Sequence, residues 1–304
     1  NVSYQYPQKK KSGALSQLAP ICPSFEKWHK IIDEVTRNIE NDMEVDGIYF
    51  DEISAHPAAP CYNGDHSHLP GGGSWWVDGY SRMMERIRMK NSAKKFYFSE
   101  ANAEPFIKSF DGFLTWTWVE NGDVPAYPAI YAGYIQMLGR STNGKKKDDY
   151  DFFKYFTAKS LLYGQQIGWC KADVVYDEKR LSFLKKIVDL RYQYTYLFQT
   201  SQLLRPPKIW CSLDPVVTGP ALWYNDEIVM EQVLCGAWQS RNKSETVLFL
   251  INISEHESDF EMSFHYKEYK IDPKSLPIEF SANGKMCSVK GKLGPLECKV
   301  WNLK

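Results

Sequence analysis

The segment that decides the fold reads Val-Asp-Gly-Ile-Tyr-Phe-Asp-Glu and covers residues 45–52. Its Asp-Gly pair is a typical break between elements, and the apolar run from Ile48 to Phe50 predicts a short buried strand. Two acids, Asp51 and Glu52, come directly after this run. Acids at the carboxyl end of a strand are typical of the catalytic edge of a parallel β/α sheet.

Helical patterns flank this strand on both sides. Residues 24–44 and residues 75–90 carry apolar side chains at steps of three and four, which predicts amphipathic helices. A second strand is expected at 95–99, and it ends on Glu100. The order helix, strand, long loop, helix, strand indicates a parallel sheet with crossover helices.

The same alternation continues toward residue 200. A third strand is expected at 112–116, followed by helices near 130–138, 152–163 and 178–198. The sequence therefore predicts an α/β fold, most simply a (β/α) TIM-type barrel. We expect residues 1–205 to form the C-terminal portion of this barrel.

The pattern changes after Arg205-Pro206-Pro207, where short strand-like segments separated by turn residues replace the helices. The expected strands cover residues 229–238, 246–253, 261–266, 285–289 and 298–303. This pattern is typical of an antiparallel β-sandwich, which we expect to form a second domain at 206–304.

Composition and charge exclude some classes of partner. Lysine plus arginine and aspartate plus glutamate both number 37, and this zero net charge argues against binding to nucleic acid. No apolar run reaches the ~18 residues of a membrane-spanning helix, so we expect no membrane insertion. The seven cysteines do not decide the compartment, for which a periplasmic or secreted location is the hypothesis.

Asp51 and Glu100 are the candidate catalytic pair. They lie 100 − 51 = 49 positions apart, with one loop and one helix between them, so they should end adjacent strands. Neighbouring strand ends can bring two carboxylates to the ~5–6 Å that a retaining glycosidase requires. The alternative is that such acids cap the following helices or pair with lysines.

The loop over residues 54–74 is long for a compact domain, and such loops are usually functional. Its histidines and the adjacent tryptophans suit a polar ligand such as a sugar, whose apolar face stacks on aromatic rings. Cys61, His66 and His68 could instead hold zinc, but a fourth ligand at conventional spacing is missing. We therefore predict no metal and no other cofactor.

A resemblance to a known family is carried by motifs spread over the first half of the chain. They are Cys22-Pro23, Val45 to Ile53, Cys61-Tyr62, His66-Ser67-His68, Gly71-Gly72-Gly73, Gly79-Tyr80 and Ser99 to Pro105. These motifs, within about residues 20–140, resemble a largely uncharacterised family of bacterial barrel glycosidase-like proteins. That family is distantly similar to the endo-α-N-acetylgalactosaminidases and the α-amylase superfamily.

The resemblance implies an aspartate nucleophile after the fourth barrel strand and a glutamate acid/base after the fifth. Asp51 matches the first position and Glu100 the second. Three β/α units of ~30 residues each should then precede the first of these strands, yet only about 45 residues do. We therefore expect the chain to be a piece of a longer protein. An inactive relative that kept the fold is the alternative.

Neighbouring side chains complete the predicted site. Alternation along a strand should turn Glu52 to the face opposite Asp51, which predicts a structural role for it. Glu104 rivals Glu100 as the acid/base. The expected substrate-binding residues are His66, His68, Trp75, Trp76, Asn102, Glu104, Trp116 and Trp118.

Three functions compete on this evidence. The leading hypothesis is a retaining glycosidase that needs no cofactor and acts on an oligosaccharide, a polysaccharide or a glycoconjugate. The second is a non-catalytic carbohydrate-binding protein on the same fold, and the third is a metal-dependent hydrolase that uses His66 and His68. The sugar, its linkage, exo or endo action and the oligomeric state do not follow from the sequence.

Overall fold

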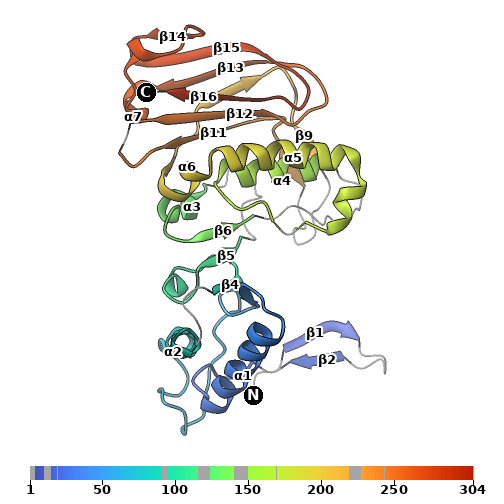
Figure 1. Ribbon diagram of the computed structural model, residues 1–304, viewed down its shortest axis with the longest axis vertical. Coiled ribbons are helices and arrows are strands. Elements are labelled where there is room, and N and C mark those ends of the chain that lie inside the picture. The colour runs from blue at the N-terminus through green and yellow to red at the C-terminus, as the bar shows by residue number, and fades with distance from the viewer. Residues whose placement is uncertain are drawn as a thin grey trace. The chain divides into compact units, whose positions relative to one another are not determined.

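A computed structural model describes most of the chain (Figure 1). The described residues are 4–9, 15–18, 20–90, 95–115, 124–139, 150–168, 170–218, 227–242 and 244–303. Contacts between residues divide the chain into two units, Asn1–Phe113 and Leu114–Lys304. Among the described residues, no helix combines the length and the apolar character that crossing a membrane requires.

The first unit contains a short hairpin and then the predicted alternation of helices and strands. Its elements are β1 (Tyr4–Lys9), β2 (Leu15–Leu18), α1 (Glu26–Asp42), β3 (Gly47–Phe50), α2 (Trp75–Lys90), β4 (Phe96–Glu100), η1 (Glu104–Phe106) and β5 (Gly112–Leu114), which reaches the unit boundary. Strands β3 and β4 are parallel neighbours, with Gly47 opposite Phe96 and Phe50 opposite Ser99. The expected helices at 24–44 and 75–90 and the strands at 48–50 and 95–99 are confirmed. The hairpin of β1 and β2 was not expected.

Helices α1 and α2 both contact Tyr97 of β4, whose ring centroid lies 4.9 Å from the guanidinium carbon of Arg88 on α2. Met83, Met84 and Ile87 of α2 are at most 1% exposed, and so is Tyr97 of β4. The Tyr97 hydroxyl donates a 2.6 Å hydrogen bond to the buried carboxylate of Glu40 on α1. Contacts from both helices to Tyr97 therefore hold the strand that carries Glu100.

Pro23, just before α1, is fixed between the two helices. The buried ring of His29 lies 2.5 Å, through Nε2, from the Pro23 carbonyl oxygen. From the other side, Gly79 of α2 lies so close that a Cβ there would be 2.7 Å from that same carbonyl. The absence of a side chain at position 79 thus permits the close approach of α2 to this segment.

The second unit begins with helices. Its elements up to residue 200 are α3 (Ala126–Tyr131), β6 (Gln136–Leu138), α4 (Tyr150–Leu162), η2 (Ala172–Tyr176), α5 (Glu178–Gln193) and α6 (Thr195–Thr200). The helix expected at 152–163 is confirmed, and the one expected at 178–198 is interrupted at Tyr194. The helix expected at 130–138 is wrong, because Gly133 takes a φ of 82° and the chain turns into a strand.

The rest of the second unit consists mainly of antiparallel strands. These are β7 (Gln202–Leu204), β8 (Lys208–Cys211), β9 (Val216–Thr218), β10 (Ile228–Met230), β11 (Val233–Gln239), β12 (Thr246–Asn252), β13 (Ser258–His265), β14 (Phe280–Asn283), β15 (Met286–Leu293) and β16 (Cys298–Leu303), with α7 (Tyr266–Tyr269) and η3 (Pro273–Ser275) between β13 and β14. They form two four-stranded sheets, ordered β16-β12-β11-β7 and β14-β15-β13-β8, and the pair β9-β10. Buried side chains of both four-stranded sheets, such as Leu248 and Met262, belong to one core. The antiparallel strands expected after residue 205 are confirmed.

Trp238 of β11 explains why residues before and after position 205 share a unit. Its buried indole Nε1 donates a 2.9 Å hydrogen bond to the Leu162 carbonyl at the end of α4. Its ring also meets Phe198 of α6 edge to face, with centroids 5.2 Å apart. Helices and sheet are thus joined in one core of the second unit, which begins at Leu114.

Gly79→Ala should destabilise the first unit. Alanine normally stabilises a helix relative to glycine by about 1 kcal/mol, but here its Cβ would contact the Pro23 backbone, which cannot rotate away. We expect a net loss of about 1–3 kcal/mol in the free energy of unfolding, measured by urea denaturation. Gly72→Ala is the control, since no described heavy atom lies within 4 Å of its added Cβ. Equal stability of the two variants would contradict this packing.

Candidate functional site

Three carboxylates gather at the carboxyl ends of β3 and β4. Asp51 follows Phe50, the last residue of β3, and Glu100 is the last residue of β4. Because Phe50 lies opposite Ser99, the parallel register brings these two acids to the same edge. One carboxylate oxygen each of Asp51, Glu52 and Glu100 lies within 4.8 Å of the others. We call these three residues the carboxylate cluster.

The presence of Glu52 in this cluster corrects a prediction. Its side chain was expected on the face opposite Asp51, but alternation holds only within a strand and β3 ends at Phe50. Glu52 takes a left-handed φ of 64°, and Ala101, directly after Glu100, takes 58°. Residues other than glycine adopt this conformation rarely, and backbone strain of this kind is concentrated at functional sites.

Two serines connect the ends of the strands. The Ser99 hydroxyl donates to the Phe50 carbonyl at 2.8 Å and accepts from the Ser54 backbone N–H at 3.3 Å. The Ser54 hydroxyl lies against the carbonyl oxygens of Glu100 and Ala101. These bonds bridge the backbone on both sides of the carboxylate cluster, so they limit the separation of its members.

Tyr49 of β3 lies two residues before Asp51, and its hydroxyl is close enough to the carboxylate cluster to interact with its charges. Burial, followed by the negative charges of Glu100 and Asp51, raises the pKa of the Tyr49 hydroxyl far above its usual range. The hydroxyl therefore keeps its proton beside these carboxylates. We did not expect Tyr49 in the site, because Asp51 lies beyond the end of β3, where strand alternation does not place it.

The remaining predicted site residues fall into two groups. Asn102 is half-buried and lies two residues after the end of β4, and Glu104 is exposed at the first position of η1. Their expected contact with substrate stays a prediction. Trp116 and Trp118 lie outside the described residues.

Trp75 and Trp76 begin α2 and are only 4% and 6% exposed. The ring of Trp75 stacks on His68 with centroids 5.3 Å apart, and that of Trp76 stacks on His56 at 5.7 Å. Both indoles are thus part of an aromatic core, and their role as sugar platforms stays a prediction. Trp76 also lines a cavity of about 330 Å³ together with Cys61, His66 and other residues of the loop.

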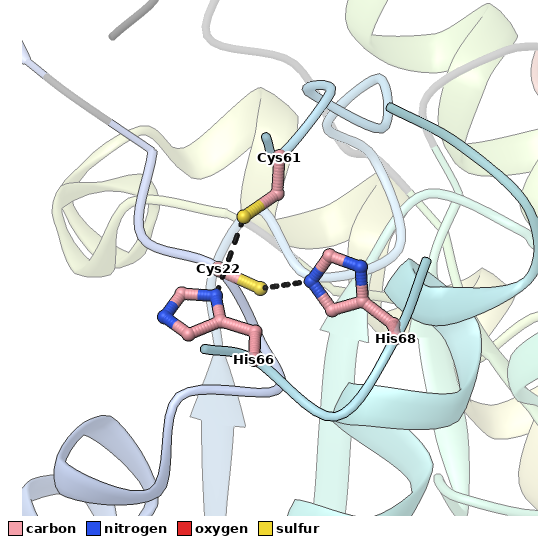
Figure 2. A group of neighbouring side chains, drawn as sticks. All are labelled: Cys22, Cys61, His66 and His68. Carbon is pink, nitrogen blue, oxygen red and sulfur yellow. Dashed lines mark hydrogen bonds between the residues drawn. The ribbon is translucent and has the colours of Figure 1, made fainter. Parts of the chain in front are cut away.

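A second group of reactive side chains lies in the first unit, as Figure 2 shows. We call it the cysteine–histidine cluster, and its members are Cys22, Cys61, His66 and His68. Cys22 Sγ lies 3.2 Å from His68 Nε2, and Cys61 Sγ lies 3.3 Å from His66 Nδ1. These are donor atoms that could hold a metal. Cys22 stands 61 − 22 = 39 positions before Cys61, so spacing along the sequence did not reveal it.

Comparisons with known proteins point to one functional class. Residues 6–142 match a family described as "Domain of unknown function (DUF6259)". A Bacteroides thetaiotaomicron protein named "Putative glycoside hydrolase" is 28% identical over 249 residues, which are 78% of this chain and 35% of that protein. A Monosiga brevicollis protein named "Putative glycoside hydrolase 22789" is 29% identical over 48% of this chain and 13% of its own length.

The chain thus spans about a third or less of the length of these two relatives. Among solved structures, the noncanonic maltogenic α-amylase AmyB from Thermotoga neapolitana aligns with 97% of this chain and 69% of its own. The TM-score is 0.50 and the sequence identity 9%, so this likeness concerns the fold alone. The similarity of this chain to an uncharacterised, glycoside-hydrolase-like family, expected from its motifs, is therefore confirmed.

Proposed function

We propose that this chain carries the active site of a retaining glycoside hydrolase, with Asp51 as nucleophile and Glu100 as acid/base. The observation that carries the proposal is the separation of at most 4.8 Å between carboxylate oxygens at neighbouring strand ends. Retaining enzymes hold their two carboxyl groups ~5–5.5 Å apart, whereas inverting enzymes need ~6.5–9.5 Å to admit a water molecule. The short separation supports retention.

The reaction then has two displacements. Asp51 attacks the anomeric carbon while Glu100 gives its proton to the leaving oxygen, and a covalent glycosyl–enzyme ester forms. Glu100 next takes a proton from water, which attacks the same carbon and releases Asp51. The anomeric configuration is inverted twice and is therefore retained.

Tyr49 and the serine bridge give this pair its alignment in the proposal. In this proposal the Tyr49 hydroxyl donates a hydrogen bond to Asp51, which would restrict the rotation of the carboxylate and leave its other oxygen to attack the sugar. The bonds of Ser54 to the carbonyls of Glu100 and Ala101 hold the opposite strand end. The reacting groups are thus positioned before the substrate binds.

The finer features of the fold belong to the same proposal. The parallel strands β3 and β4 correspond to two neighbouring strands of a (β/α) barrel, and acids at their carboxyl ends suit that architecture. The two four-stranded antiparallel sheets with their shared core correspond to a β-sandwich. The substrate is an oligosaccharide, a polysaccharide or a glycoconjugate.

Asp51→Asn should abolish the turnover of every glycoside that the unaltered protein cleaves, because an amide cannot form the ester intermediate. A panel of aryl glycosides and natural oligosaccharides would measure this, with the anomer of the first product followed by NMR. Asp42→Asn, an exposed change at the end of α1, is the control and should keep full activity. Turnover by Asp51→Asn would contradict the assignment. Binding of oligosaccharide without turnover by the unaltered protein would favour the carbohydrate-binding alternative.

Glu100→Gln should slow substrates with poor leaving groups most, by roughly 10²–10⁴-fold, because activated aryl groups leave without protonation. Added azide should restore part of the activity of Glu100→Ala on activated substrates and yield a glycosyl azide of retained configuration. Glu104→Gln is the matched comparison, because Glu104 lies in η1 four positions after Glu100. If Glu104→Gln alone showed the dependence on leaving group, the acid/base role would belong to Glu104.

Tyr49→Phe should lower kcat by roughly 10- to 150-fold, because a hydrogen bond to a charged group contributes ~1.5–3 kcal/mol. The fold should persist, since the ring is retained and only the hydroxyl is lost. Steady-state kinetics on the best aryl glycoside would test this, with Tyr192→Phe on the exposed side of α5 as control. An unchanged kcat would show that the contact with Asp51 does not serve the reaction.

A further inference from the structure

We propose that the cysteine–histidine cluster binds one zinc ion, which stabilises the loop between β3 and α2. This site is separate from the carboxylate cluster and does not depend on the proposed glycosidase activity. Three of its residues, Cys61, His66 and His68, come from the loop over residues 54–74. Cys22 comes from the segment that precedes α1.

The geometry fits a tetrahedral ion. One donor atom from each of the four side chains lies within 4.8 Å of all the others. Zinc bonds of ~2.3 Å to sulfur and ~2.0–2.1 Å to nitrogen place neighbouring tetrahedral ligands about 3.6 Å apart. The two observed sulfur–nitrogen distances, 3.2 and 3.3 Å, are close to that value. In Figure 2 the four side chains point toward a common centre.

The donor chemistry selects the ion. Two thiols and two imidazoles form a Cys₂His₂ set, which is a typical composition of structural zinc sites. Calcium and magnesium prefer oxygen ligands, and this cluster offers none. Because four protein ligands fill a tetrahedral shell, no position is left for a substrate. The site is therefore structural, and the zinc does not act as a catalyst.

Supporting contacts orient both imidazoles. The Nδ1 of His68 lies 2.8 Å from the Leu69 carbonyl oxygen, so this nitrogen carries the proton and Nε2 is left to face Cys22. Such a hydrogen bond on the second ring nitrogen is the usual partner of a zinc-bound histidine. The His68 ring also stacks on Trp75, and the His66 ring stacks on Phe25 with centroids 5.5 Å apart.

The cluster also explains how the loop keeps a fixed shape. The Gly71 N–H donates a 2.7 Å bond to the Cys61 carbonyl, which closes the segment between them. Cys22 is next to Pro23, the residue that His29 and Gly79 fix between the two helices. A zinc ion would connect the closed loop to this anchored segment, and a loop of twenty-odd residues gains most from such a connection.

The test begins with the metal content of the whole protein, purified without chelator. Mass spectrometry of the metals should find close to one zinc per chain, and Co²⁺ should replace it with the strong visible absorption of a tetrahedral thiolate site. Cys22→Ser and His68→Ala should each reduce bound zinc to less than about a tenth. Cys211→Ser is the control, a half-buried free cysteine in the second unit, and should keep the zinc.

Hydrogen exchange adds a readout for the structural role. Removal of zinc by a chelator should reduce protection at residues 22 and 61–68 and leave the second unit unchanged. Asp51→Asn should retain the full zinc content, so failure of the glycosidase assignment and failure of this site are distinguishable. If a ligand variant does not fold, the cobalt spectrum of the unaltered chain decides the matter. Absence of bound zinc with no tetrahedral cobalt spectrum, or a Cys22–Cys61 disulfide in the purified protein, would overturn the proposal.

Discussion

The in-register pairing of β3 with β4 is the constraint on which the carboxylate cluster depends. Phe50 lies opposite Ser99, so both strands end at the same level and the acids that follow lie at one edge of the sheet. A shift of one residue would turn one of the acids to the other face of the sheet. The Ser99 bond to the Phe50 carbonyl fixes this register where the strands end.

Helices and strands with a regular spacing of apolar residues were predictable. The places where the chain departs from that spacing were not. Apolar spacing predicted α1, α2 and α4 and the two strands that carry Asp51 and Glu100. The same spacing failed at 130–138, because Gly133 turns the chain there. Antiparallel strands after position 205 were predictable, but the shared core around Trp238 was not, since no local pattern reports contacts between distant segments.

The site was predictable to a similar extent. Asp51 and Glu100 followed from strand ends and family motifs, because both signals are local. Glu52 was misplaced because strand alternation was applied one residue beyond the strand. Cys22 was missed because ligands of one cluster can come from segments far apart in sequence. Sequence spacing therefore placed the two acids at neighbouring strand ends, whereas it brought together only three of the four members of the cysteine–histidine cluster.

The left-handed backbone at Glu52 and Ala101 has a consequence for anyone who engineers this protein. Design for heat resistance commonly begins by replacing strained residues with glycine, which adopts a positive φ without cost. Two of the five such residues among those described, Glu52 and Ala101, directly follow the two candidate catalytic acids. A glycine at either position would relieve strain, but it would also loosen the backbone that positions Asp51 and Glu100. Under the proposed assignment, thermostability and catalytic power therefore compete at the same two peptide units.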